Sequence, residues 1–327
     1  MRSGLHRVSL TCMLLAMPAA VGGCKRAHDK PVAPASNGEP LAVFVSILPQ
    51  KYFVERVGGE RVRVEVLVGP GQSPVTYAPP PRQLARLAEA DVYFRVGVPF
   101  EQQLADKIER TFRDLKVVDT QQGITRRSLP EHGHQADHAH GEGAEPDDRN
   151  LDHDHDQEEK DPHVWLDPEL VKLQTRVVCD ALKKIDPDHA DEYETNLALF
   201  HGELDALRNE IAEALAPLKG REFFVFHPAY GYFAERFGLE QVAVETGGKE
   251  PTPRQLAALI ERARKAGVRL IFVQPQFSRD SAKTLAAEIG GAVVDVDPLA
   301  EDYMTNLRDM AVKVREALRF EEVRASE

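Results

Sequence analysis

Short apolar segments alternate with amphipathic segments along most of the chain. The first apolar run is 41–48, followed by a helical pattern over 51–57 and a second apolar run over 62–68. Runs of β-branched residues bounded by turns predict strands, and apolar residues spaced by three or four predict helices. Strands that alternate with helices predict mostly parallel sheets covered by helices on their faces.

The same alternation continues through the rest of the chain, interrupted by one long helical pattern. Between Pro187 and Pro217, apolar residues recur every three or four positions over about six turns, which predicts one rigid helix. The predicted fold is therefore α/β, with two lobes built on mostly parallel sheets and joined by this helix. The predicted boundaries are 41–186 for the N-terminal lobe, 187–217 for the linking helix and 218–327 for the C-terminal lobe.

The first residues have the pattern of an export signal. The apolar run from Val8 to Val21 follows basic residues and is short for a membrane span, so 1–23 is predicted to be a signal peptide. The run ends in a sequence that resembles a lipobox, which makes Cys24 a candidate for lipidation and 24–40 a tether rich in Pro, Ala and Ser. The alternative is an ordinary signal cleaved near Ala20, with Cys24 incidental.

Charge is concentrated in one insertion, 131–160. The chain has a net charge of −12, and this stretch alone holds eleven acidic residues against two basic ones. An acidic balance disfavours non-specific nucleic-acid binding and favours cations as ligands. The stretch has almost no apolar residues, so we expect it to lack a core and to be disordered without metal. It also holds six histidines, which suit zinc, copper or nickel: His132, His134, His138, His140, His153 and His155.

Three further candidates for binding a ligand lie where loops are predicted. His227 follows a predicted strand and precedes a helix, a position at which α/β sheets present ligand groups. Asp297 follows the last predicted strand in the same way, although a carboxylate there can also cap a helix. His163 lies in a proline-rich loop after the insertion. Either histidine can alternatively be a hydrogen-bonded structural residue.

Several ordered motifs carry a resemblance to a known family. The most specific of them is Asp161-Pro162-His163-Val164-Trp165-Leu166-Asp167-Pro168, and the others lie at 46–53, 68–71, 226–233, 248–253 and 297–299. Nearly the whole mature chain thereby resembles the zinc-binding proteins of bacterial ABC importers, the cluster A-I or high-affinity zinc uptake family. A His-rich acidic insertion before the second ligand is also frequent in its zinc members.

This resemblance implies a function and a site. It implies a monomeric protein of the periplasm or cell surface, lipid-anchored to the membrane, which captures zinc between its lobes and delivers it to an ABC permease. His163, His227 and Asp297 are the implied metal ligands, and an imidazole at His227 favours zinc over manganese. The resemblance implies no enzymatic activity.

One position departs from the family pattern. The first binding loop of the family reads Pro-His-x-Tyr-x-Pro, whereas here Val75 stands where the histidine is expected. Two histidines and a carboxylate can still hold zinc when water fills a fourth position. We therefore expect a weaker site, or one completed by a histidine of 131–160.

Two other functions remain alternatives on the sequence alone. An open zinc site can activate water, but a zinc hydrolase needs a positioned general base, and no His-Glu-x-x-His pair occurs in the sequence. A metal-binding adhesin or a metal chaperone of the same fold is the other alternative.

The composition of 131–160 leads to a first testable prediction. We expect deletion of these residues to leave thermal unfolding of the metal-free protein nearly unchanged, because a stretch without apolar side chains contributes little to a core. The same deletion should lower the number of zinc ions bound per chain. Calorimetry and metal analysis measure the two effects, and a large loss of stability would contradict the prediction.

Overall fold

The computed structural model describes residues 39–129, 160–245, 252–277 and 279–325. The predicted signal peptide, Cys24, the tether up to residue 38 and the six histidines of 131–160 lie outside the described residues. Among the described residues the strands are β1 (Leu41–Val45), β2 (Val62–Val66), β3 (Val92–Arg95), β4 (Lys116–Asp119), β5 (Glu222–Val225), β6 (Glu240–Ala243), β7 (Leu270–Val273) and β8 (Ala292–Asp295). The α-helices are α1 (Leu48–Gly58), α2 (Pro81–Ala88), α3 (Phe100–Thr111), α4 (Pro168–Ile185), α5 (Ala190–Leu215), α6 (Gly231–Phe237), α7 (Pro253–Lys265), α8 (Arg279–Glu288) and α9 (Tyr303–Ala325).

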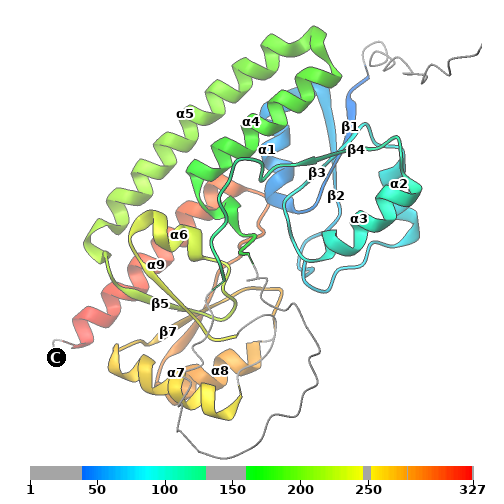
Figure 1. Cartoon of the computed structure of the whole chain (residues 1–327). Coiled ribbons are helices and arrows are strands. Elements are labelled where there is room, and N and C mark those ends of the chain that lie inside the picture. The colour runs from blue at the N-terminus through cyan, green and yellow to red at the C-terminus, as the bar shows by residue number, and fades with distance from the viewer. Residues whose placement is uncertain (1–38, 130–159, 246–251, 278, 326–327) are drawn as a thin grey trace, which may run out of the picture. The chain divides into compact units, whose positions relative to one another are not determined.

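The strands form two parallel sheets of four, one in each lobe (Figure 1). The first has the order β2-β1-β3-β4 and the second β6-β5-β7-β8, so the two lobes repeat one topology. In both, the order of strands reverses beside the first strand of the lobe, between β1 and β3 and between β5 and β7. Ligands of open α/β sheets bind at such a switch point, beyond the carboxyl ends of the strands.

The sequence of each strand explains its place in the sheet. The central strands β1, β3, β5 and β7 are mainly apolar and almost wholly buried. The edge strands carry charged or polar residues and are partly exposed, as in β2 and β4. Because central parallel strands are covered on both faces, only apolar runs are suited to these positions.

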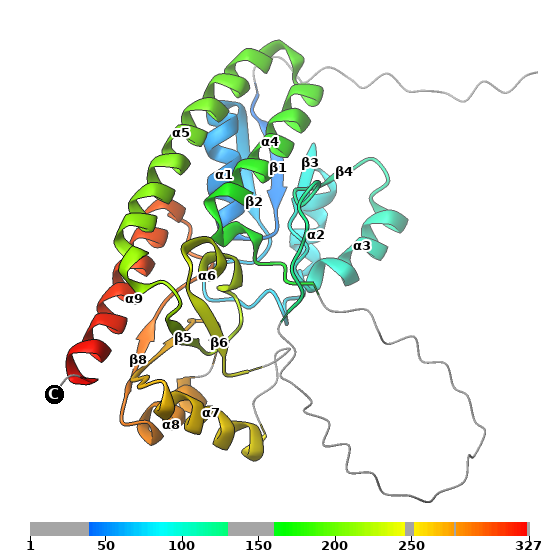
Figure 2. The ribbon, with the colours of Figure 1, turned by 60° about the vertical axis from the view of Figure 1, so that its left-hand side comes forward.

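Alternate residues of the strands face different sets of helices. In the first sheet, Val43 and Phe94 pack with α1, α4 and the start of α5, whereas Phe44 and Tyr93 face α2 and α3. In the second sheet, Phe224 packs with α7 and α8, and its neighbour Phe223 faces the side of α5, α6 and α9. Figures 1 and 2 show α4 and α5 side by side along the first sheet, with α2 and α3 on its other side.

Helix α5 belongs to the cores of both lobes. Its apolar stripe is fully buried at seven positions: Tyr193, Leu197, Phe200, Leu204, Leu207, Ile211 and Leu215. The first two pack in the core of the first lobe, and the other five belong to a cluster that contains residues of both sheets. The predicted linking helix is thus present, flanked by 3₁₀ turns at Pro187–His189 and Ala216–Leu218.

The connection between the lobes is broader than the one helix that the sequence predicts. Helix α9 leaves the second sheet and packs along α5 (Figure 1), and its first residue, Tyr303, lies edge-on to Phe53 of α1 at 4.8 Å between ring centres. Helix α9 begins at Tyr303, and two residues just before it contact the first lobe: Pro298 accepts from Trp165, and Glu301 is paired with Lys51 of α1. The lobes therefore share one continuous apolar core.

Polar contacts also join the lobes. The guanidinium of Arg236 on α6 donates to both carboxylate oxygens of Asp167, at 2.8 and 2.7 Å, and Asp167 is also the N-cap of α4. The indole Nε1 of Trp165 donates to the carbonyl of Pro298 at 2.8 Å. Bidentate charge-assisted bonds are stronger than neutral ones and fix the relative orientation of their partners.

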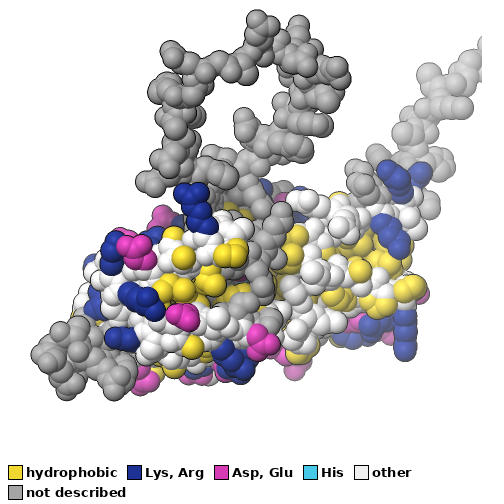
Figure 3. Space-filling view, turned by 90° about the horizontal axis from the view of Figure 1, so that it is seen from below, with side chains coloured by type: hydrophobic (Ala, Val, Ile, Leu, Met, Phe, Trp, Pro, Cys, Tyr) yellow, Lys and Arg dark blue, Asp and Glu magenta, His cyan; other side chains and the backbone are white. Residues whose placement is uncertain are grey.

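Within the described ranges, no helix combines the length and apolarity needed to cross a bilayer. The face in Figure 3 has basic, acidic and apolar side chains interspersed, without a large patch of one charge.

Candidate functional site

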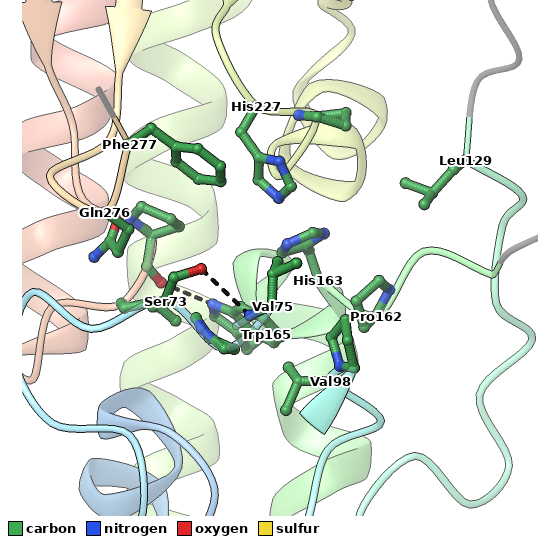
Figure 4. A pocket seen from close by; sticks show the side chains of 15 residues that line it. Ser73, Val75, Val98, Leu129, Pro162, His163, Trp165, His227, Gln276 and Phe277 are labelled. Atoms are coloured by element: carbon green, nitrogen blue, oxygen red, sulfur yellow. Dashed lines mark hydrogen bonds between the residues drawn. The ribbon is translucent and has the colours of Figure 1, made fainter. Parts of the chain in front are cut away.

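A pocket lies between the two lobes, beyond the carboxyl ends of the strands at both switch points. Its wall comes from loops that follow β2, β3, β5, β7 and β8 and from the loop that precedes α4 (Figure 4). We call it the interlobe pocket. It is lined by Ser73, Pro74, Val75, Val98, Pro99, Leu129, Pro162, His163, Trp165, His227, Pro228, Gln276, Phe277, Pro298 and Leu299.

His163 is held in place by the residues that precede it. The carboxylate of Asp161, which is fully buried, accepts from the backbone N–H of His163 at 3.0 Å and lies 2.7 Å from its ring Nδ1. Gln121 holds the same loop by donating its amide to the carbonyl of Pro162 at 3.1 Å. With Nδ1 paired to Asp161, Nε2 is the ring atom of His163 that can bind a ligand.

His227 is positioned in the same way by the second lobe. Its Nδ1 is hydrogen-bonded to the carboxylate of Glu245, which follows β6 and is buried. Gln274, after β7, donates to the carbonyl of His227 at 3.0 Å and so fixes its backbone, and Phe277 stacks on its ring at 4.6 Å between centres. Burial lowers the pKa of His227 below its usual range, although Glu245 acts in the opposite direction. A neutral imidazole is the form that binds metals.

The two histidines face each other across the pocket (Figure 4). Their ring centres are 5.3 Å apart, and the rings are inclined by 75°. A zinc ion bonded to two imidazoles at 2.0–2.1 Å with a tetrahedral angle would place the ring centres about 5 Å apart. The observed spacing fits one metal ion shared by His163 and His227.

Asp297 lies beside the pocket without joining the two histidines. Its Oδ1 accepts from the amide of Gln276 and from the backbone N–H of Leu299, each at 2.9 Å. In the described part of the chain, no group of three His, Cys, Asp or Glu side chains is arranged to hold a metal ion. The predicted three-ligand set therefore stays a prediction that needs Asp297 to change partners. Asp297 does not cap α9, which begins six residues later.

Val75 is part of the wall of the same pocket. It is 40% exposed, and Ser73 hydrogen-bonds its backbone N–H at 3.3 Å within the loop that follows β2. The structure thus places Val75 in one pocket with His163 and His227 (Figure 4). Val75 thus places a hydrocarbon side chain at a position from which a longer, polar side chain could reach the space between the lobes.

The comparisons with known proteins decide the family. The family described as "ZnuA: Zinc-uptake complex component A periplasmic" matches residues 43–317. This chain belongs to that family. The resemblance inferred from the sequence motifs is confirmed, as is the α/β fold with two parallel sheets and a long helix.

Individual relatives agree with this assignment. The chain is 29% identical over 313 residues to the high-affinity zinc uptake system protein ZnuA of Brucella abortus, covering 86% of this chain and 92% of that one. A crystal structure of ZnuA has 38% identity and a TM-score of 0.75, covering 85% of this chain and 99% of that one. A second, described as a 138-173 deletion mutant of ZnuA with zinc bound, has 39% identity, a TM-score of 0.75 and coverages of 85% and 98%.

Sequence reasoning missed the carboxylates that hold the histidines. Asp161 lies two residues before His163, a spacing at which a side chain can hydrogen-bond the nearby backbone. Glu245 directly follows an apolar strand segment, which is the signal that could have identified it. Nothing local in the sequence links Glu245 to His227, which is 18 residues away.

A third buried carboxylate, Glu101 in the first turn of α3, supports the wall of the interlobe pocket in this ZnuA family member. It accepts from the backbone N–H groups of Val96 at 2.8 Å and Gly97 at 2.7 Å, and from the hydroxyl of Ser46. Gly97 has φ +79°, and a Cβ there would come within 2.7 Å of Gln121. Burial raises the pKa of Glu101 to about 7, against the effect of these donors.

Glu101 leads to a prediction about stability and pH. Its pKa is about 7 in the folded protein against a reference value of 4.5, so the folded state retains a proton that the unfolded chain releases between these values. Stability contributed by this group is therefore lost as pH rises from about 4.5 to 7, by roughly 3 kcal/mol. We expect the advantage of the wild type over Glu101→Gln in unfolding free energy to be larger at pH 5 than at pH 8.

Urea unfolding across this pH range measures the difference. The exposed substitution Glu60→Gln serves as the matched control and should show no such trend. A difference between wild type and Glu101→Gln that is constant with pH would contradict the prediction.

Proposed function

We propose that this chain is the extracytoplasmic protein that captures zinc for an ABC importer. Zinc is held in the interlobe pocket by His163 and His227 and is then released to the permease. The observation that carries the proposal is the pair of imidazoles with centres 5.3 Å apart, each backed by a buried carboxylate. The zinc uptake role of the ZnuA proteins supports it.

The carboxylates behind the histidines suit this task. A metal-binding histidine usually donates its second ring nitrogen to a carboxylate or carbonyl, which fixes the ring and makes the free nitrogen more basic. Asp161 and Glu245 do this for one histidine each, and each belongs to the same lobe as its histidine. Each lobe therefore presents a preoriented ligand, and one zinc ion joins a ligand from each lobe.

Two positions of a four-coordinate zinc remain to be filled. Asp297 is the implied third ligand, and it reaches the metal if its carboxylate exchanges Gln276 and Leu299 for zinc. The fourth position belongs to water or to a histidine of 131–160. Zinc sites with three protein ligands and one open position are common where the bound species must exchange.

The same proposal includes the location and anchoring of the protein. A periplasmic zinc-uptake component acts outside the cytoplasmic membrane. Lipidation of Cys24 and the tether over 24–40 would keep the monomer close to its permease. Membrane fractionation of the protein and its Cys24→Ala form tests this part separately from zinc binding.

The contacts of the two carboxylates weigh against a zinc hydrolase. A hydrolase needs a general base within hydrogen-bond reach of the metal-bound water. Asp161 and Glu245 each already hold an imidazole, and Asp297 is the implied third zinc ligand, so none of these three is left to act as that base. The arrangement suits capture and release rather than activation of water.

The decisive experiment concerns the two histidines. In the protein that lacks 131–160, we expect His163→Ala or His227→Ala to abolish tight zinc binding, because one imidazole cannot replace two. Isothermal titration measures the loss. His189→Ala, whose ring is paired with Asp186 away from the pocket, is the matched control and should bind zinc as the parent does. Tight binding that survives both pocket substitutions would refute the proposed site.

Another prediction concerns the buried partner of His227. Glu245→Gln keeps the size of the side chain but replaces a charged acceptor by a neutral one, so the imidazole becomes a poorer ligand. We expect zinc affinity to fall about tenfold to a hundredfold. Titration with zinc measures the change, and Glu213→Gln on the exposed side of α5 is the control. Unchanged affinity would show that Glu245 does not act through His227.

The last prediction on zinc binding concerns Val75. We expect Val75→His to tighten zinc binding, because it adds an imidazole to the pocket that holds His163 and His227. If a histidine of 131–160 normally fills the open position, the gain should be larger when these residues are deleted, since two groups competing for one position are not additive. Titration of the four proteins in this cycle measures the coupling. An equal gain in both backgrounds would exclude a ligand from 131–160.

A further inference from the structure

Apart from the two histidines, the polar side chains of the interlobe pocket's described lining are bonded to protein atoms. Ser73 pairs with the N–H of Val75, Trp165 donates to the carbonyl of Pro298, and Gln276 donates to Asp297. The remaining lining residues are aliphatic, aromatic or proline. The described wall therefore offers two imidazole nitrogens as metal donors within a largely hydrocarbon surface.

The space in front of the histidines is large for a hydrated ion. The pocket has a volume of about 150 Å³. A water molecule occupies about 30 Å³ in the liquid and needs two to four polar partners to be held in a cavity. Water that completes the zinc shell here would face Val75, Val98 and Phe277, which provide none.

We propose that the interlobe pocket takes zinc as a complex with a small organic chelator that supplies two donors and places a flat apolar ring against Val75, Val98 and Phe277. This inference rests on the proposed zinc site. The two imidazoles and a bidentate chelator complete a four-coordinate zinc, so the chelator takes the two positions that Asp297 and water would otherwise fill. Asp297 then keeps its bonds to Gln276 and Leu299, and the ring fills the apolar space. Phe277, already stacked on His227, offers an aromatic surface beside the metal.

The position of Val75 makes this arrangement possible. An imidazole at this position would supply a third nitrogen and occupy part of the same space. The valine leaves both a coordination position and a volume free, and its methyl groups contact apolar groups favourably. The site thereby binds a chelated zinc ion more tightly than the bare ion, which His163 and His227 still hold.

The test uses picolinate, the anion of pyridine-2-carboxylic acid, which joins a nitrogen and a carboxylate donor to one aromatic ring. The mature full-length protein is mixed with zinc and labelled picolinate and passed through a desalting column. We expect picolinate to be retained only when zinc is present. Glycinate, which has the same kinds of donors without a ring, should bind at least about tenfold more weakly, because it buries no ring.

Variants show whether the chelator is bound in the pocket. His163→Ala and His227→Ala should lose picolinate retention. This loss would show that the chelator is not bound at the histidines of 131–160, which both variants keep. Val75→His should lose retention while still binding zinc, and Val75→Phe should lose it by filling the cavity without adding a donor. Circular dichroism and thermal unfolding confirm that each variant is folded.

The outcomes separate this inference from the proposed function. If zinc binds in a manner that depends on His163 and His227 but picolinate is not retained, the chelate inference is wrong and the zinc site stands. If glycinate is retained as well as picolinate, the apolar wall does not select the ligand and the inference is also overturned. If neither zinc nor picolinate binds in a histidine-dependent manner, both proposals fail.

Discussion

The apolar stripe of α5 is the constraint on which the rest of the structure depends. One helix packs first against the sheet of the N-terminal lobe and then within a cluster that includes both sheets. Because α9 packs along α5 and returns to α1 through Tyr303, the two lobes cannot separate without exposing a shared core. This core keeps the two switch points facing one pocket, so a residue after β5 can lie beside a loop of the other lobe.

The pocket is assembled from matched halves. Each lobe contributes one histidine and one buried carboxylate that holds its Nδ1, so neither lobe has a complete site alone. Burying a carboxylate is costly unless it is hydrogen-bonded or paired, and a bound divalent cation would offset that cost for both. The oxygens Asp161 Oδ2 and Glu245 Oε2 have no hydrogen-bond partner, which agrees with a site that is most stable when a cation is present.

Val75 sets the chemistry of one side of the pocket. The loop that carries it lines the pocket and is held by Ser73, and Glu101 supports the wall formed after β3. The pocket has one metal-binding side chain fewer and one aliphatic side chain more, because Val75 stands where the family pattern has a histidine. A zinc site poorer in protein ligands exchanges its cargo more readily and leaves room for donors brought by the ligand.

The sequence by itself determined the α/β class, the order of elements, the long helix and the family, because these depend on local periodicity and on contiguous motifs. It also indicated His163 and His227 as candidate ligands. It further indicated that Val75 departs from the family pattern of the first binding loop. Only the tertiary structure decided that Glu245 holds His227, that α9 joins the lobes, and that Asp297 is bonded to Gln276. The physical reason is that these contacts join strand ends and helices far apart in the chain, whose proximity is set by sheet order and core packing.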